Sequence, residues 1–125
     1  MRKTIISSDK LPVFGPYSAA VEAGGFIFIS GQIALDPKTG AVITDIQSVT
    51  RQVLTNIQTI LEEAGLKLTN IVKTTIYLKN INDFATVNEI YAGFFPQEPP
   101  ARSTIEVSSL PKGVPIEIEA IAVRN

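Results

Sequence analysis

Hydrophobic residues recur along this chain at two different spacings, which predict strands and helices in alternation. Residues 71–79 alternate with period two, as in a strand that has one face toward a core. Residues 44–64 repeat at the helical spacing, from the capping box Thr44-Asp45-Ile46-Gln47 to a stop at Gly65. A second helical pattern covers 82–95. Further strands are predicted at Lys3 to Ser7, Ala19 to Glu22, Phe26 to Ser30, Ala101 to Val107 and Pro115 to Val123.

These elements follow one another in the order β-β-β-α-β-α-β-β, with Gly24-Gly25 as a hairpin turn. The order predicts an α+β fold, a mixed β-sheet with two helices packed on one face. The other face also carries apolar side chains, so we expect self-association. The predicted core positions are Ile46, Val49, Val53, Ile57, Ile60 and Ala64 in the first helix, Phe84, Val87, Tyr91 and Phe94 in the second, and Val72, Thr74, Ile76 and Leu78 in the alternating strand.

Composition narrows the function classes. The 125 residues are 45% apolar and 18% charged, as expected for one folded domain spanning 1–125. The net charge is −1 without a basic cluster, so nucleic-acid binding is disfavoured. Apolar runs are too short for a membrane span and the amino terminus does not resemble a signal peptide, so we expect a cytoplasmic protein. The chain has no histidine and no cysteine, which removes imidazole and thiolate catalysis and most transition-metal sites; no metal and no cofactor are expected.

Arg102 is the first candidate functional residue. It follows the double proline 99–100, which forbids helix and stiffens the approach to a short strand. A guanidinium on such a backbone is suited to gripping a small carboxylate or phosphate with two parallel hydrogen bonds. The alternative is a structural arginine that pairs with Glu106, Glu117 or Glu119.

Glu117 and Glu119 have the same parity in the last strand, so they point to the same side, together with apolar residues. A carboxylate in apolar company must find a partner or raise its pKa, unless it is an ordinary edge or surface charge. Asn88 flanks the apolar stripe of the second helix, where it is either a boundary residue or a hydrogen-bonding group for a ligand or partner.

Two turn segments complete the candidates. Gly15-Pro16-Tyr17-Ser18 fixes the phenol of Tyr17 at a stiff turn, as core filler or as a ligand contact. Ser30 and Gly31 end an apolar strand and permit close approach of another group to the backbone.

Taken together, these segments resemble the Rid (YjgF) family of reactive intermediate deaminases over almost the whole chain. The motifs that carry the resemblance are Gly15-Pro16-Tyr17-Ser18, Ile29-Ser30-Gly31-Gln32, residues 70–75, residues 83–88, Pro100-Ala101-Arg102-Ser103, Leu110-Pro111-Lys112 and Ile116-Glu117-Ile118-Glu119-Ala120. The resemblance implies a chorismate-mutase-like (YjgF-type) fold and a homotrimer with a central β-barrel, with ligand pockets in the clefts between subunits.

The resemblance also implies roles for individual residues. Arg102 would clamp the substrate carboxylate, and Glu117 would bond the substrate nitrogen or the attacking water. Tyr17, Ser30, Gly31 and Asn88 match positions that line or support the pocket. Many relatives carry Cys where this chain has Thr104. If the family's ligand contact at this position is made by the backbone amide, Thr104 can make the same contact.

The implied reaction is the hydrolysis of 2-iminobutanoate or 2-iminopropanoate to a 2-keto acid and ammonia, without a cofactor. Two alternatives stay open: a non-enzymatic regulatory protein that binds small carboxylates through the same arginine, and, less favoured, a ribonuclease or translation inhibitor.

Overall fold

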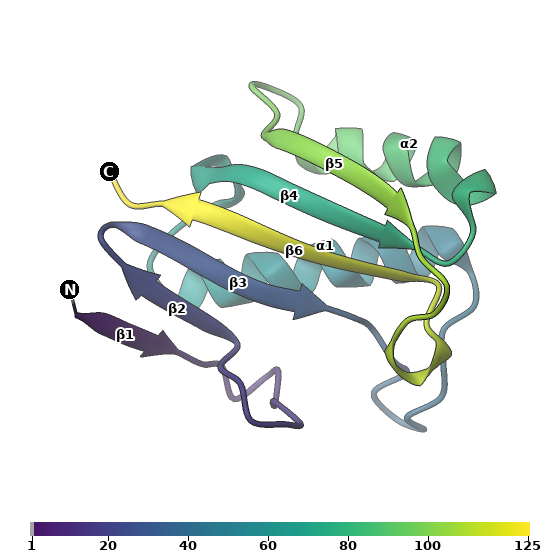
Figure 1. Cartoon of the computed structure of the whole chain (residues 1–125), viewed down its shortest axis with the longest axis horizontal. Coiled ribbons are helices and arrows are strands. Elements are labelled where there is room, and N and C mark those ends of the chain that lie inside the picture. The colour runs from purple at the N-terminus through teal and green to yellow at the C-terminus, as the bar shows by residue number, and fades with distance from the viewer. Residues whose placement is uncertain (1) are drawn as a thin grey trace.

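The computed structural model describes residues 2–125 and contains one six-stranded sheet and two long helices (Figure 1). The strand order across the sheet is β1-β2-β3-β6-β4-β5; β4 and β5 run parallel and all other neighbours are antiparallel. The strands are β1 (Lys3–Ile6), β2 (Ala20–Ala23), β3 (Phe26–Gln32), β4 (Ile71–Leu78), β5 (Ala101–Glu106) and β6 (Ile116–Val123), and the helices are α1 (Ile46–Glu63) and α2 (Phe84–Phe94). The predicted order of elements is confirmed.

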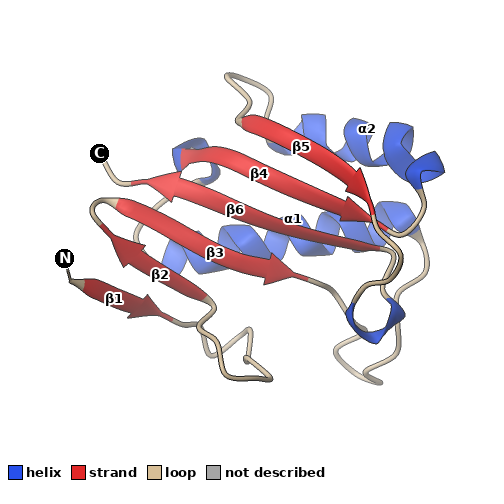
Figure 2. Ribbon diagram, in the orientation of Figure 1, coloured by secondary structure: helices blue, strands red, loops and turns tan. Residues whose placement is uncertain are grey.

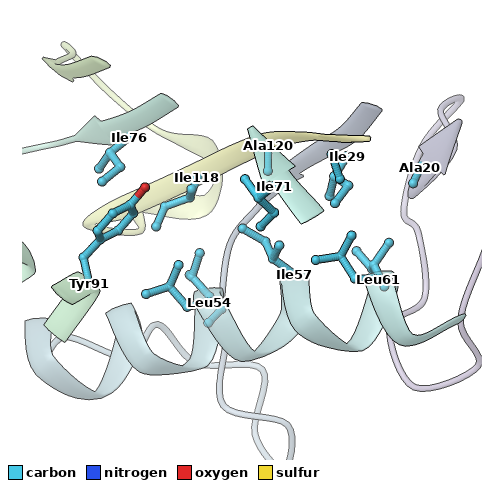
Figure 3. Packing of buried hydrophobic residues seen from close by; sticks show 14 of the residues in the cluster. Ala20, Ile29, Leu54, Ile57, Leu61, Ile71, Ile76, Tyr91, Ile118 and Ala120 are labelled. Atoms are coloured by element: carbon cyan, nitrogen blue, oxygen red, sulfur yellow. The ribbon is translucent and has the colours of Figure 1, made fainter. Parts of the chain in front are cut away.

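Both helices lie on the same face of the sheet, as predicted (Figure 2). The core is formed between this face and the buried side of α1, from which Leu54, Ile57 and Leu61 point toward the strands (Figure 3). Ile29, Ile118 and Ala120 meet them from the sheet. Of the residues described, 2–125, no helix is both long enough and apolar enough to cross a membrane.

Helix α1 begins one residue later than the predicted capping box. Asp45, not Thr44, is the N-cap, and its carboxylate accepts a hydrogen bond from the backbone N–H of Ser48. Both residue types can cap a helix, and the charged carboxylate also interacts favourably with the helix dipole. The predicted stop is confirmed, since Gly65 adopts a φ of 74° just after the helix.

Two predicted core positions are wrong, and the predicted stripe on α1 is incomplete. Val72 is 42% exposed, because β4 has a bulge between Ile71 and Lys73 that turns Ile71, not Val72, into the core. Phe84 opens α2 at the sheet edge and is 38% exposed. The stripe on α1 is wider than predicted and includes buried Leu54 and Leu61.

The face of the sheet away from the helices is open. We call it the open face; its positions include Phe26 and Phe28 of β3, Glu117 and Glu119 of β6 and Tyr77 of β4, which follow from the strand register. Phe26 and Phe28 are 45% and 47% exposed, and Ile5 and Ile105 add apolar side chains near the two edges. The predicted uncovered apolar face is therefore present in the single chain.

Candidate functional site: two halves on opposite faces of the sheet

Arg102 and Glu117 lie on opposite faces of the same sheet. Arg102 is paired with Thr74 of β4, whose buried side chain faces the helices. Glu117 is paired with Tyr77, three residues further along β4 and therefore on the open face. The two side chains singled out from the sequence are not brought together within one chain.

The first group of residues surrounds Arg102 on the helix side of the edge strand β5; we call it the arginine half-site (Arg102, Asn88 and Thr104). The Arg102 guanidinium lies 4.9 Å from the ring centroid of Tyr91 and 5.6 Å from that of Phe84, both on α2. Stacking on aromatic rings orients a guanidinium while leaving its N–H donors available. Within residues 2–125 the one ion pair joins Arg124 to Glu22, so none of the three glutamates considered from the sequence neutralises Arg102.

Polar atoms beside Arg102 also lack partners. Oδ1 of Asn88 and Oγ1 of Thr104 are buried and have no hydrogen-bond partner among residues 2–125. Asn88 lies on α2 one turn from Phe84 and Tyr91, and Thr104 has the same parity on β5 as Arg102. Unsatisfied buried polar atoms are uncommon in folded proteins. Asn88 shares α2 with both rings under Arg102, and Thr104 shares a face of β5 with it, so the two unsatisfied atoms belong to the same half-site.

Tyr91, which supports Arg102, is itself held from the sheet. Its hydroxyl lies 2.7 Å from Oγ1 of the buried Thr74 on β4, and burial raises the pKa of Tyr91. Thr74 is the position paired with Arg102, so one strand residue fixes the aromatic ring on which the guanidinium stacks.

We expect Thr74→Val to lower the free energy of unfolding by about 1–3 kcal/mol, because the isosteric change leaves the buried Tyr91 hydroxyl without a partner. Urea unfolding measures the loss. The double variant Thr74→Val/Tyr91→Phe should be less destabilised than the sum of its single changes, and Thr4→Val on the exposed edge strand serves as control. Strict additivity would contradict the hydrogen bond.

The second group lines a cleft on the open face; we call it the glutamate half-site (Tyr17, Ser30, Gly31 and Glu117). The cleft has a volume of about 430 Å³. Its full lining comprises Tyr17, Ile29, Ser30, Gly31, Ile33, Pro111, Glu117 and Glu119. All four open-face residues proposed from the sequence thus meet in one place.

A β-bulge shapes this cleft. Ser30 and Gly31 are both inserted opposite Glu119, between the paired positions of Ile29 and Gln32. The Ser30 hydroxyl donates a hydrogen bond of 2.6 Å to the carbonyl of Ser18, and the Ser30 N–H donates one of 2.9 Å to the carbonyl of Ala19. These bonds tie the bulge to the turn that carries Tyr17. Tyr17 is 54% exposed, so the core-filler interpretation of its ring is wrong.

Gly31 leaves room for the Glu117 carboxyl. A Cβ atom at position 31 would lie only 2.0 Å from Oε2 of Glu117. The close approach expected at the Ser-Gly pair is therefore made, within this chain, by a carboxyl group. Burial raises the pKa of Glu117, and the negative charge of Glu119 raises it further.

We expect Gly31→Ala to fold but to displace the Glu117 carboxyl, lowering any activity that depends on it by roughly 10- to 100-fold. The backbone at this position has no left-handed conformation that alanine would resist, and the obstructing atoms belong to a flexible side chain. Gly93→Ala on α2 is the matched control, because a Cβ there meets nothing within 4 Å. Full activity of Gly31→Ala would show that this position of the carboxyl is not needed.

The sequence did not identify Tyr77, Phe84 or Tyr91 as parts of either half-site. Tyr77 donates a hydrogen bond of 2.7 Å to Glu119, and the two rings of α2 stack under Arg102. The helical spacing of Phe84, Asn88 and Tyr91 could have indicated that the two aromatic rings lie beside Asn88. Within residues 2–125 no group of three acidic residues is placed to hold a metal ion.

The fold and the cleft define the class of the protein. It is a small α+β protein with both helices on one face of a mixed sheet and, on the other face, a carboxyl-lined cleft beside a β-bulge. Comparison with known proteins then gives the family. The family model described as "Endoribonuclease L-PSP" matches residues 7–124. The chain belongs to this family, also called the Rid or YjgF family.

Individual relatives match along their full length. A 2-iminobutanoate/2-iminopropanoate deaminase of Salmonella typhimurium is 52% identical over 100% of both chains, and a RutC family protein of Pyrococcus horikoshii is 53% identical over 100% of both. The solved structure of Escherichia coli TdcF with bound serine superimposes with a TM-score of 0.91 at 43% identity, covering 98% of this chain and 99% of that one.

Proposed function

We propose that the protein hydrolyses 2-imino acids such as 2-iminobutanoate and 2-iminopropanoate to 2-keto acids and ammonia. The observation that carries this proposal is the unpaired guanidinium of Arg102, held on two aromatic rings beside two unpartnered polar atoms. Relatives that match over the full chain and are named 2-iminobutanoate/2-iminopropanoate deaminase support the same reaction.

In this proposal Arg102 binds the substrate carboxylate with two charge-assisted hydrogen bonds. Thr104 and Asn88 supply further polar contacts from the same half-site. Binding of the carboxylate acts in the ground state and the transition state alike, so it concentrates and orients the substrate without lowering the chemical barrier. The acceleration must come from a group that responds to the changing charge at the imine.

Glu117 is that group. Its negative charge favours the protonated imine, the better electrophile, and its carboxylate orients a water molecule toward C2. As the water oxygen bonds to C2, Glu117 takes its proton and returns it to the nitrogen of the carbinolamine. The carbinolamine hydroxyl then gives its proton to Glu117 as the C=O bond forms and the C–N bond breaks. The departing ammonia takes that proton, so that the protonated imine and water become the keto acid and ammonium. No redox step occurs, and the residues named suffice without a cofactor.

Because the two half-sites lie on opposite faces of one sheet, we infer that a working site takes Arg102 from one copy and Glu117 from another. Two different surfaces then meet, which is a heterologous contact, and such contacts form rings when the rotation closes. The exposed apolar residues of the open face supply the area to be buried. With the family resemblance we propose a homotrimer whose sheets line a central barrel; sedimentation equilibrium measures the mass directly.

The test generates 2-iminobutanoate in situ and follows its decay with and without protein. Wild-type protein should accelerate the decay, and Arg102→Ala and Glu117→Ala should accelerate it far less at a substrate concentration below the wild-type KM. If the wild-type protein leaves the rate of decay unchanged, the proposal that the protein is an imine hydrolase is wrong. Binding of small carboxylates that depends on Arg102 without any hydrolysis would instead establish the regulatory alternative.

A further inference from the structure

A second carboxylate lies close to Glu117 and is fixed in place. Glu119 has the same parity on β6 and lines the same cleft. The hydroxyl of Tyr77 donates to Oε1 of Glu119 at 2.7 Å, while Tyr77 itself is paired with Glu117 in the sheet register. One tyrosine therefore sits opposite one carboxylate and holds the other.

The hydrogen bond fixes Tyr77 as the donor. This bond, with burial, raises the pKa of Tyr77 to about 12. The phenol thus keeps its proton over the whole range in which carboxyl groups titrate. The hydrogen bond therefore holds the Glu119 carboxyl in place on the open face, two residues along β6 from Glu117.

Other charged groups around Glu117 are few. On β4 the open-face position beyond Thr75 is Lys73, whose ammonium lies 3.4 Å from the Thr75 hydroxyl and forms no ion pair with Glu119 within residues 2–125. The bulge of β3 offers Ser30 and Gly31, neither of which titrates in this range. Lys79 continues the open-face parity of β4 beyond Tyr77, and its ammonium donates to the carbonyl of Ser108. The Tyr17 phenol and Lys112, next to the lining residue Pro111, also lie near the cleft.

We propose that Tyr77 and Glu119 act as a positioning pair, which fixes a negative charge beside Glu117 and so keeps that carboxyl able both to take and to return a proton. The inference rests on the proposed function, because the proton affinity of Glu117 matters only if this carboxyl transfers protons during the reaction. A general base works best when its proton affinity approaches the working pH. An anion near Glu117 makes its carboxylate a stronger base and favours a cationic imine in the cleft.

Two variants separate charge from structure. Glu119→Gln keeps an oxygen that accepts from Tyr77 and removes only the charge. Tyr77→Phe keeps the charge and removes the hydrogen bond. Glu63→Gln, on the exposed side of α1, is the control for a change in net charge.

The first measurement is a ¹³C NMR titration of the Glu117 carboxyl in the full-length protein labelled with ¹³C-glutamate. Glu119→Gln should move the titration midpoint of Glu117 to lower pH, Tyr77→Phe should move it less, and Glu63→Gln should leave it in place. An unchanged midpoint in Glu119→Gln would overturn the proposal, whatever happens to stability.

The second measurement is the pH dependence of kcat/KM for imine hydrolysis. The acidic limb should shift to lower pH in Glu119→Gln by the same interval as the NMR midpoint. If the acidic limb of Glu119→Gln stays at the wild-type pH while the thermal stability falls, Tyr77 and Glu119 have only a structural role and the proposal is wrong. If the wild-type protein hydrolyses nothing, the proposed function fails, but the NMR titration still decides whether Glu119 controls the protonation of Glu117.

Discussion

Replacing Glu117 with glutamine is expected to lower kcat for imine hydrolysis by roughly 10²- to 10⁴-fold, the usual contribution of a positioned general acid–base group. Glutamine occupies the same space above Gly31 but neither takes a proton nor favours the protonated imine. Binding of an unreactive 2-keto acid should change little, since its carboxylate is held by Arg102. Measurement of kcat under saturating substrate separates the two effects.

Stability provides the control for this variant. The pKa of Glu117 is raised in the folded protein by burial and by Glu119, so ionisation of Glu117 weakens the fold as the pH rises through that raised value. Removing the charge should therefore leave the melting temperature at neutral pH equal or higher. A variant that loses activity and also melts lower would point to misfolding, and one that keeps the wild-type kcat would contradict the role of Glu117.

Arg102→Ala is expected to reduce kcat/KM by about 100-fold, mainly through KM, because charge-assisted hydrogen bonds contribute about 1.5–3 kcal/mol. Arg102→Lys should recover only part of this loss, since an ammonium cannot make two parallel hydrogen bonds and stacks less well on Tyr91 and Phe84. Initial rates over a range of substrate concentrations give both constants.

The matched control for Arg102 is Arg51→Ala, which removes an exposed arginine from α1 and should be neutral. Isothermal titration calorimetry with an unreactive 2-keto acid measures how much affinity Arg102→Ala loses, independently of catalysis. If Arg102→Ala binds the keto acid as tightly as the wild type, the carboxylate is held elsewhere and the proposed site is wrong.

Periodicity was sufficient to predict the elements of this fold. The helical spacing of 44–64 and the alternation of 71–79 each correspond to a real helix and strand, because one face of each packs on a common core. The position of Val72 could not be predicted in this way. A bulge depends on how β4 pairs with β6, and that pairing is not encoded in the spacing of either strand alone.

Candidate residues were also easier to name than to place. The sequence singles out Arg102 and Glu117 as candidates for the chemistry but does not show which face each one occupies. Arg102 faces the helices because β5 pairs in parallel with β4, a register set by tertiary contacts. Alternation puts Tyr77 on the side of its strand opposite Ile76 and Leu78, yet its bond to Glu119 joins residues 42 positions apart, which no local pattern predicts.

The opposite placement of Arg102 and Glu117 is most directly tested by mixing two inactive variants. Arg102→Ala and Glu117→Gln would be co-expressed with different affinity tags, and mixed oligomers carrying both tags would be isolated and assayed. If each site takes its arginine from one copy and its glutamate from the next around a ring of three, every isolated mixed trimer restores about one site in three, whichever variant supplies two of its copies. At a substrate concentration well below the wild-type KM, activity near that level and far above that of either variant alone is the expected result. Mixed oligomers as inactive as the single variants would contradict a site shared between copies.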